Sequence, residues 1–170
     1  FVGNGAGPLI HRALPQGVDP DREAEILADY RAYYQAHNCV ETRPYDGIGP
    51  LLERLRQAGV RTAVVSNKPD RTTRTLAARF FPELDGAMGQ REGIASKPAP
   101  DMVRAALDQL HAAPEEALYV GDSEADVATA RNAGLDMIGV AWGFRGRAAL
   151  EAAGAPLVAD TPEQLLDMLQ

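Results

Sequence analysis

Cysteine is scarce in this chain of 170 residues, and long apolar runs are absent. Cys39 is the only cysteine, so no intramolecular disulfide can form, which favours a reducing compartment. No apolar run approaches the ~20 residues needed to cross a bilayer. Phe1-Val2-Gly3-Asn4-Gly5 has neither an initiator methionine nor a signal-peptide pattern. We therefore expect a cytoplasmic protein without a membrane partner, whose sequence begins inside a longer gene product.

Positive charge is also scarce, and it is unevenly distributed. The chain has 17 basic and 24 acidic residues, for a net charge of −7. Residues 1–100 carry 13 basic and 12 acidic residues, whereas residues 101–170 carry four basic and 12 acidic ones. Fifteen of the basic residues are arginines, and the two lysines are Lys68 and Lys97. Nucleic acids and anionic membranes bind basic patches, so neither is expected as a partner, whereas small phosphate ligands remain compatible.

The length fits one domain, or a core with a small satellite, because a chain of this size buries roughly 70% of the surface that it exposes when unfolded. Asp19-Pro20 supplies an N-cap and a first-turn proline, and apolar residues then recur at helical spacing over residues 19–38. Pro44-Tyr45-Asp46-Gly47 has turn chemistry. We predict a small helical subdomain over residues 1–42 and a second unit over residues 43–170.

In the second unit, helical patterns alternate with short apolar runs. The pattern predicts helices around 51–58, 70–80, 99–111 and 124–133 and after Thr161, and strands at 60–65, 117–120, 137–141 and 156–159. Thr161 and Gln164 have the spacing of a capping box. Strands that alternate with helices imply an α/β fold with a Rossmann-like parallel sheet and helices on both faces.

Three polar segments stand where such a sheet would bind a ligand. They are Ser66-Asn67-Lys68-Pro69, Ser96-Lys97-Pro98-Ala99-Pro100-Asp101 and Gly121-Asp122-Ser123-Glu124-Ala125-Asp126. The first and third follow predicted strands, and ligands of open parallel sheets bind beyond the carboxyl ends of strands. The second segment begins a predicted helix.

Each segment taken alone has an ordinary structural explanation. Ser66 or Asn67 could cap the following helix, and Lys97 could be a solvated side chain. Asp122 and Ser123 could be N-cap residues, with Asp126 in a favourable first-turn position. The joint occurrence of the three segments, in this order at these strand ends, favours a functional site.

Phosphate chemistry accounts for the three segments together. A hydroxyl and a backbone N–H at Ser66 and Asn67 can donate to phosphoryl oxygens. Lys97 offers a compact positive charge for a phosphate or a carboxylate. Asp122 and Asp126 supply the hard oxygen ligands that suit Mg²⁺. Gly121 allows the backbone to approach the site closely.

The ordered set Ser-Asn-Lys, Ser-Lys-Pro-Ala-Pro-Asp and Gly-Asp-Ser-Glu-Ala-Asp resembles motifs two, three and four of the haloacid dehalogenase-like (HAD) hydrolase superfamily. Further segments resemble its phosphoglycolate phosphatase branch: Phe1-Val2-Gly3-Asn4-Gly5, Pro44-Tyr45-Asp46-Gly47, Ala130-Arg131-Asn132-Ala133-Gly134 and Ala141-Trp142-Gly143. The resemblance covers nearly the whole chain, and it is more specific for the superfamily than for the branch.

The resemblance implies a Mg²⁺-dependent phosphomonoester phosphatase that acts on a small phosphorylated metabolite, with 2-phosphoglycolate as the best single substrate. Ser66 would hydrogen-bond the transferring phosphoryl group, with the Asn67 backbone assisting. Lys97 would hold the nucleophile and the phosphoryl charge together. Asp122 would ligate Mg²⁺, and Asp126 would act through a metal-bound water or by orienting the loop.

The first motif of the superfamily, Asp-x-Asp followed by Gly-Thr, does not occur in this sequence. That motif carries the aspartate nucleophile, which forms an aspartyl-phosphate intermediate, and a second aspartate that serves as general acid and base. Asp46 follows no predicted strand and reads as a turn residue. The resemblance thus implies a core without its first, nucleophile-bearing strand. It also implies a lid-like cap over residues 1–42 that is incomplete at its N-terminus, with Gly3-Asn4-Gly5 near its entry. We expect residues 1–170 alone to hydrolyse no phosphate ester.

Two alternatives remain open at this point. A phosphosugar mutase or an inorganic pyrophosphatase of the same superfamily would share the core motifs, because the cap decides between them and fold-level analogy cannot. A non-catalytic member that binds phosphate ligands or a protein partner is expected if the first motif is truly absent from the gene. The sequence indicates no oligomeric state.

Overall fold

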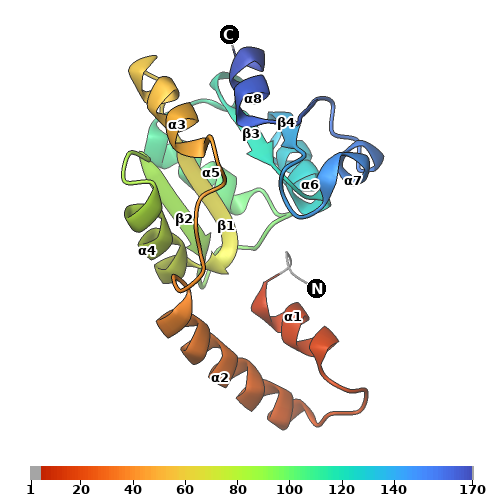
Figure 1. Cartoon of the computed structure of the whole chain (residues 1–170). Helices are drawn as coiled ribbons and strands as arrows, with labels where there is room; N and C mark the ends of the chain where they lie inside the picture. The colour runs from red at the N-terminus through yellow and green to blue at the C-terminus, as the bar shows by residue number, and fades with distance from the viewer. Residues whose placement is uncertain (1–4, 170) are drawn as a thin grey trace.

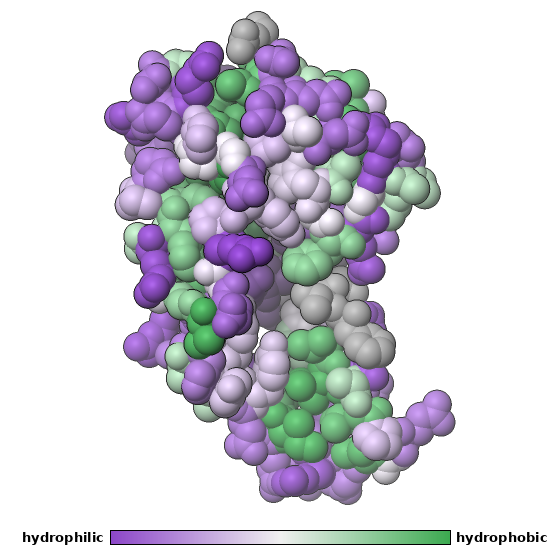
Figure 2. Space-filling view, in the orientation of Figure 1, coloured by the Kyte–Doolittle hydropathy of each residue, from purple (hydrophilic) through white to green (hydrophobic). Residues whose placement is uncertain are grey.

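The computed structural model describes residues 5–169, so the expected placement of Gly3 and Asn4 near the cap entry lies outside the described residues. Two helices, α1 (Ala6–Ala13) and α2 (Pro20–His37), pack against each other and extend away from the strands (Figure 1). α2 has no buried residue. Hydrophobic residues gather around α1 in the space-filling view, whereas much of the remaining visible face is hydrophilic (Figure 2). The division at residue 42 stays a prediction.

The predicted start of α2 is confirmed by its capping hydrogen bonds. Asp19 accepts from the backbone N–H groups of Asp21 and Arg22 at 2.9 and 3.4 Å, and Pro20 occupies the first helical turn. A side-chain cap of this kind is worth about 1 kcal/mol, because it satisfies backbone donors that have no partner inside the helix.

The rest of the described chain alternates between helices and strands. In chain order the elements are α3 (Ile48–Gln57), β1 (Ala63–Pro69), α4 (Asp70–Phe80), β2 (Gly86–Gln90), α5 (Asp101–Leu110), the 3-10 turn η1 (Pro114–Glu116), β3 (Leu118–Gly121), α6 (Glu124–Ala133), β4 (Asp136–Val140), α7 (Gly146–Ala152), β5 (Val158–Ala159) and α8 (Pro162–Met168). None of the helices that the structure describes is long and apolar enough to cross a membrane.

All strand pairs are parallel, which confirms the predicted α/β class. Within residues 5–169 the strands form two sheets, with the orders β1-β2 and β3-β4-β5. β1 pairs only with β2 and β3 only with β4 in the described chain, so one edge of each carries no neighbouring strand. Leu118 and Val120 of β3 are 38% and 43% exposed.

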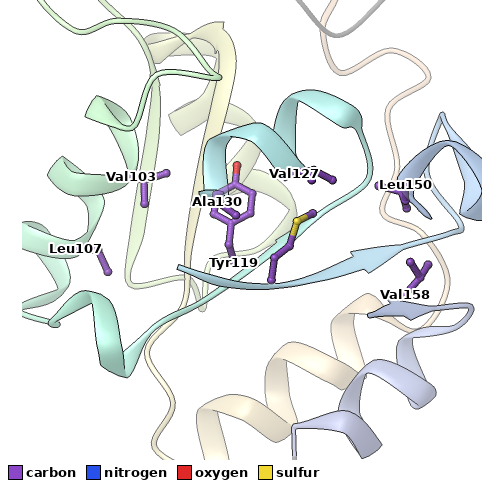
Figure 3. Packing of buried hydrophobic residues seen from close by; sticks show 8 residues of the cluster. Val103, Leu107, Tyr119, Val127, Ala130, Leu150 and Val158 are labelled. Atoms are coloured by element: carbon purple, nitrogen blue, oxygen red, sulfur yellow. The ribbon is translucent and has the colours of Figure 1, made fainter. Parts of the chain in front are cut away.

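Helices cover both faces of the larger sheet, as predicted. Consecutive strand residues point to opposite faces, and Met137 and Ile138 of β4 accordingly belong to different hydrophobic clusters. The cluster around Met137 contains residues of α5, α6 and α7, with Leu150 fully buried (Figure 3). The cluster around Ile138 contains residues of α3 and α8. The sheet is therefore the middle layer of three.

Both boundaries of the first predicted strand were wrong, and some elements were missed. The first predicted strand begins at Ala63 instead of Val60, because the backbone N–H of Val60 donates to Leu55 and closes the end of α3. The strand continues to Pro69, with a register irregularity after Val65. β2 and α7 were missed. β2 (Gly-Ala-Met-Gly-Gln) contains no β-branched residue, and pairing with β1 gives it its strand conformation.

Candidate active site

A buried ion pair between Lys97 and Asp126 lies at the centre of the predicted site. Lys97 Nζ is 2.8 Å from Asp126 Oδ1, and the two side chains are 14% and 6% exposed. Nζ also lies 3.4 Å from the carbonyl oxygen of Val65 in β1. Lys97 thus connects β1, which belongs to the smaller sheet, with the beginning of α6, which packs against the larger sheet.

The Asp126 carboxylate accepts five hydrogen bonds, from one ammonium, two hydroxyls and two backbone N–H groups. Oδ1 accepts from Lys97 and from the Tyr119 hydroxyl, at 2.8 and 3.1 Å. Oδ2 accepts from the Ser123 hydroxyl at 2.6 Å, and from the backbone N–H groups of Asp122 and Ser123 at 3.2 and 3.1 Å. Burial alone would raise the pKa of Asp126, but the Lys97 charge and the hydrogen bonds from Lys97, Ser123 and Tyr119 outweigh burial and lower it. The carboxylate is therefore ionised and fully engaged.

The same contacts form the N-terminal cap of α6. Ser123 Oγ accepts from the backbone N–H of Asp126, and the Asp126 carboxylate accepts from the backbone N–H of Ser123 in return. A Cβ at position 121 would overlap the Asp126 side chain, so this close approach requires Gly121. The ordinary capping role considered for Ser123 is confirmed, and it coexists with the buried ion pair.

Asn67 fixes the backbone of Lys97 through its side chain. The amide Nδ2 donates to the Lys97 carbonyl at 3.2 Å, and Oδ1 accepts from the Lys97 backbone N–H at 2.8 Å. Asn67 is 7% exposed. The sequence indicated only a backbone contribution from Asn67, whereas the structure shows a reciprocal side-chain clamp across 30 residues of sequence.

Ser66 and Lys68 lie on either side of Asn67 near the end of β1. Ser66 Oγ accepts from the backbone N–H of Lys68 at 3.1 Å, so its hydroxyl proton stays available to a ligand. Desolvation lowers the pKa of Lys68, the charge of Lys97 lowers it further, and Asp122 acts in the opposite direction. The charge of Lys68 thus interacts with charged residues of the predicted site, although Lys68 is exposed to solvent.

Asp122 is held by the loop between β4 and α7. The backbone N–H of Phe144 donates to Asp122 Oδ2 at 2.9 Å. A Cβ at position 143 would overlap the same carboxylate, so only Gly143 permits the contact. Arg145 anchors the loop further through an ion pair with Glu124, 3.1 Å between Nε and Oε2. This loop fixes the orientation of Asp122.

Of the two aspartates of the candidate site, Asp122 is the one whose donor set suits a metal ion. No group of three or more His, Cys, Asp or Glu side chains in residues 5–169 could hold a metal ion. In that part of the chain, Asp126 is engaged by five donors, whereas the Asp122 carboxylate accepts only from the backbone N–H of Phe144. Mg²⁺ is commonly held by one or two carboxylates together with phosphate and water. Asp122 fits that donor set as a single ligand, and Asp126 fits an orienting role.

The sequence predicted Ser66, Asn67, Lys97, Gly121, Asp122 and Asp126 as site residues. The structure links five of them, from Asn67 through Lys97 to Asp126, which contacts Gly121 and Asp122. Ser66 lies beside Asn67 in β1. Tyr119 and Phe144 were missed as partners of the two aspartates. The alternation of buried and exposed residues along β3 places Tyr119 in the interior. It could have revealed this contact, because a buried tyrosine hydroxyl requires a hydrogen-bond partner. No sequence signal identifies the Phe144 contact, since it is made by a backbone group.

Replacing Asp126 with Asn should lower the free energy of unfolding by about 3–5 kcal/mol at neutral pH, because Lys97 would remain buried without a counter-charge. The folded-state pKa of Asp126 is lowered, so its ionisation stabilises the fold above the unfolded pKa and that stabilisation disappears as pH falls, from about pH 5 downward. Asp126→Asn should therefore flatten the acid limb of stability against pH, as measured by urea unfolding. Asp108→Asn, at an exposed position, is the matched control, and an equally steep acid limb in both variants would contradict the expectation.

Comparison with known proteins agrees with this geometry. The haloacid dehalogenase-like hydrolase family model matches residues 9–140. A phosphoglycolate phosphatase of Pseudomonas putida is 31% identical over 181 residues, which are 100% of this chain and 62% of that protein. An N-acetylmuramic acid 6-phosphate phosphatase of Pseudomonas aeruginosa is 30% identical over 171 residues, covering 99% of this chain and 76% of that protein.

A crystal structure from Lactobacillus delbrueckii subsp. bulgaricus, provisionally named a phosphoglycolate phosphatase, superposes with a TM-score of 0.93 at 35% identity. The superposition covers 99% of this chain and 80% of that one. The match of the family model over most of the chain, together with the buried Lys97–Asp126 pair between the sheets, shows that this chain belongs to the haloacid dehalogenase-like hydrolase family.

Proposed function

We propose that the protein is a Mg²⁺-dependent phosphomonoester phosphatase, with 2-phosphoglycolate as the best single substrate. The observation that carries the proposal is that Lys97 contacts both Asn67 of β1 and Asp126, which in turn accepts from the backbone N–H of Asp122 after β3. Ser66 precedes Asn67 in β1. The names of the two curated relatives both denote phosphate esters of acids, glycolic and N-acetylmuramic. Those names support an acidic phosphate ester as the substrate class.

In the proposed reaction, the Ser66 hydroxyl donates a hydrogen bond to an oxygen of the transferring phosphoryl group. Lys97 neutralises charge that accumulates around that group, which is the usual role of a fixed cation in phosphoryl transfer. Asn67 contributes by holding the backbone of Lys97. Because Lys97 is already paired with Asp126, its ammonium is positioned before substrate binds and needs no reorganisation during the reaction.

The family generally uses Mg²⁺, and Asp122 is the residue that would hold it here. When bound, the ion would neutralise phosphate charge and help to align the reacting groups. The Phe144 N–H engages Asp122 Oδ2, which leaves the other carboxylate oxygen for a cation. Asp126 would orient the loop that carries Asp122, through the backbone N–H of Asp122.

The nucleophile would be the aspartate of the family's first motif, which residues 1–170 do not contain. The strand-free edges of β1 and β3 are compatible with such a strand, and its insertion would cover Leu118 and Val120. It would form an aspartyl-phosphate intermediate, which water then hydrolyses. Residues 1–42 would form most of the cap that closes over the substrate and excludes water.

A phosphate-release screen of the full-length protein with Mg²⁺ tests the proposal. The panel should compare 2-phosphoglycolate with sugar phosphates, nucleotides and pyrophosphate. A preference of at least about tenfold, or roughly 1.4 kcal/mol in transition-state binding, would justify the narrow substrate. Hydrolysis of none of them would contradict the proposal and favour a non-catalytic member. The same assay on residues 1–170 alone should detect no release.

Lys97→Arg should reduce kcat of the full-length enzyme by about a hundredfold or more, which is the usual cost of losing a fixed electrostatic contact to the transition state. Lys97 Nζ lies between Asp126 and the Val65 carbonyl in a nearly buried position, and the larger planar guanidinium does not fit there. Lys68→Arg is the matched control and should be much milder, because Lys68 is exposed. A Lys97→Arg enzyme within tenfold of the parent would contradict the assigned role.

Gly143→Ala should raise the Mg²⁺ concentration for half-maximal activity by about ten- to hundredfold, the usual effect of disturbing a group that orients a metal ligand. The new Cβ would displace the Asp122 carboxylate. Calorimetric titration with Mg²⁺ checks the binding directly. Gly49→Ala is the matched control, since a Cβ there meets no atom within 4 Å. Equal Mg²⁺ affinities of the two variants would contradict the positioning role of the loop.

A further inference from the structure

An open hollow of about 230 Å³ adjoins the candidate site on one side of β1. Its walls are mainly apolar, from Val64 of β1 and from residues of α4 and the two phenylalanines at its end, Phe80 and Phe81. Ser66 and Lys68 also line it, as alternate residues of β1 would. The proposed phosphate-binding serine is therefore shared between the candidate site and this hollow.

Two positive side chains line the hollow, and neither has an anionic partner in the described chain. They are Lys68, from β1, and Arg43, from the segment between α2 and α3. The residues that line the hollow include these two cations and no acidic side chain. In a chain with a net charge of −7, the hollow is therefore locally positive.

The surroundings of Lys68 favour an added negative charge. Desolvation is the main cause that lowers the pKa of Lys68, and the positive charge of Lys97 lowers it further, whereas Asp122 acts in the opposite direction. An anion in the hollow would stabilise the charged form of Lys68. The apolar walls would strengthen that attraction, because they exclude water from one side of the pair.

We propose that this hollow binds a second anionic group of the substrate, a carboxylate in the case of 2-phosphoglycolate, through Lys68 and Arg43. The inference rests on the proposed phosphatase function and specifies its substrate class as phosphate esters of small organic acids. The phosphate would lie on the Ser66 and Lys97 side, and the carboxylate would point towards Lys68 and Arg43. An ester with an uncharged remote group leaves both cations unpaired, and sites built for a charged group discriminate strongly against such analogues.

The test compares 2-phosphoglycolate with ethyl phosphate, in which a methyl group replaces the carboxylate. The measured quantity is the ratio of kcat/KM for the two esters with the full-length enzyme. Lys68→Met and Arg43→Gln should each lower this ratio by about ten- to hundredfold, as expected for the loss of one charge-assisted hydrogen bond. Lys68→Arg should retain most of the ratio because the charge remains.

Arg71→Gln is the control, since Arg71 is exposed and does not line the hollow. Thermal unfolding of each variant checks that folding is intact, and Arg43→Gln decides the question if Lys68→Met fails to fold. A ratio within about twofold of the parent in both variants would overturn this inference while the phosphatase proposal stands. If the parent hydrolyses neither ester, 2-phosphoglycolate fails as the proposed substrate. Calorimetric binding then decides this inference, and equal affinities for the two esters overturn it.

Discussion

The ion pair between Lys97 and Asp126 is the contact on which the other groups of the site depend. Buried charges are costly to desolvate, so such a pair contributes little net stability, although removing one partner costs much more. The pair instead fixes the positions of other groups in the site. Asp126 is held by five donors, and one of them is the backbone N–H of Asp122. Fixing Lys97 therefore also fixes the loop that presents Asp122.

The same pair spans two sheets that share no backbone hydrogen bonds in the described chain. Side-chain contacts substitute for strand pairing there: the Asn67 clamp ties Lys97 to β1, and Lys97 ties β1 to α6. Such contacts are few compared with a strand ladder. An additional parallel strand between β1 and β3 would satisfy the free edges and bring its own carboxyl end to the same place, where ligands of parallel sheets bind.

Much of the fold could be predicted from the sequence, because the helix-capping residues and the hydrophobic patterns indicate the same elements. Asp19-Pro20 and Ser123 cap the helices that their sequence context indicates, and alternation of helices and strands fixed the α/β class. The predictions failed where contacts between distant parts of the chain determine the local structure. β2 has two glycines in five residues and is a strand through its pairing with β1. The hydrogen bond from Phe144 to Asp122 is made by a main-chain N–H, which any residue could provide, so no side chain reveals it.

The two lysines, scarce in composition, are placed in opposite electrostatic situations only a short way apart. Lys97 is nearly buried and paired, so its charge is compensated before any ligand arrives. Lys68 is exposed, unpaired in the described chain and repelled by Lys97. A ligand with one phosphate and no other charge would use the first cation and leave the second uncompensated. A ligand with two anionic groups would use both, so the charge pattern of the site itself favours a doubly functional acid over a simple phosphate ester.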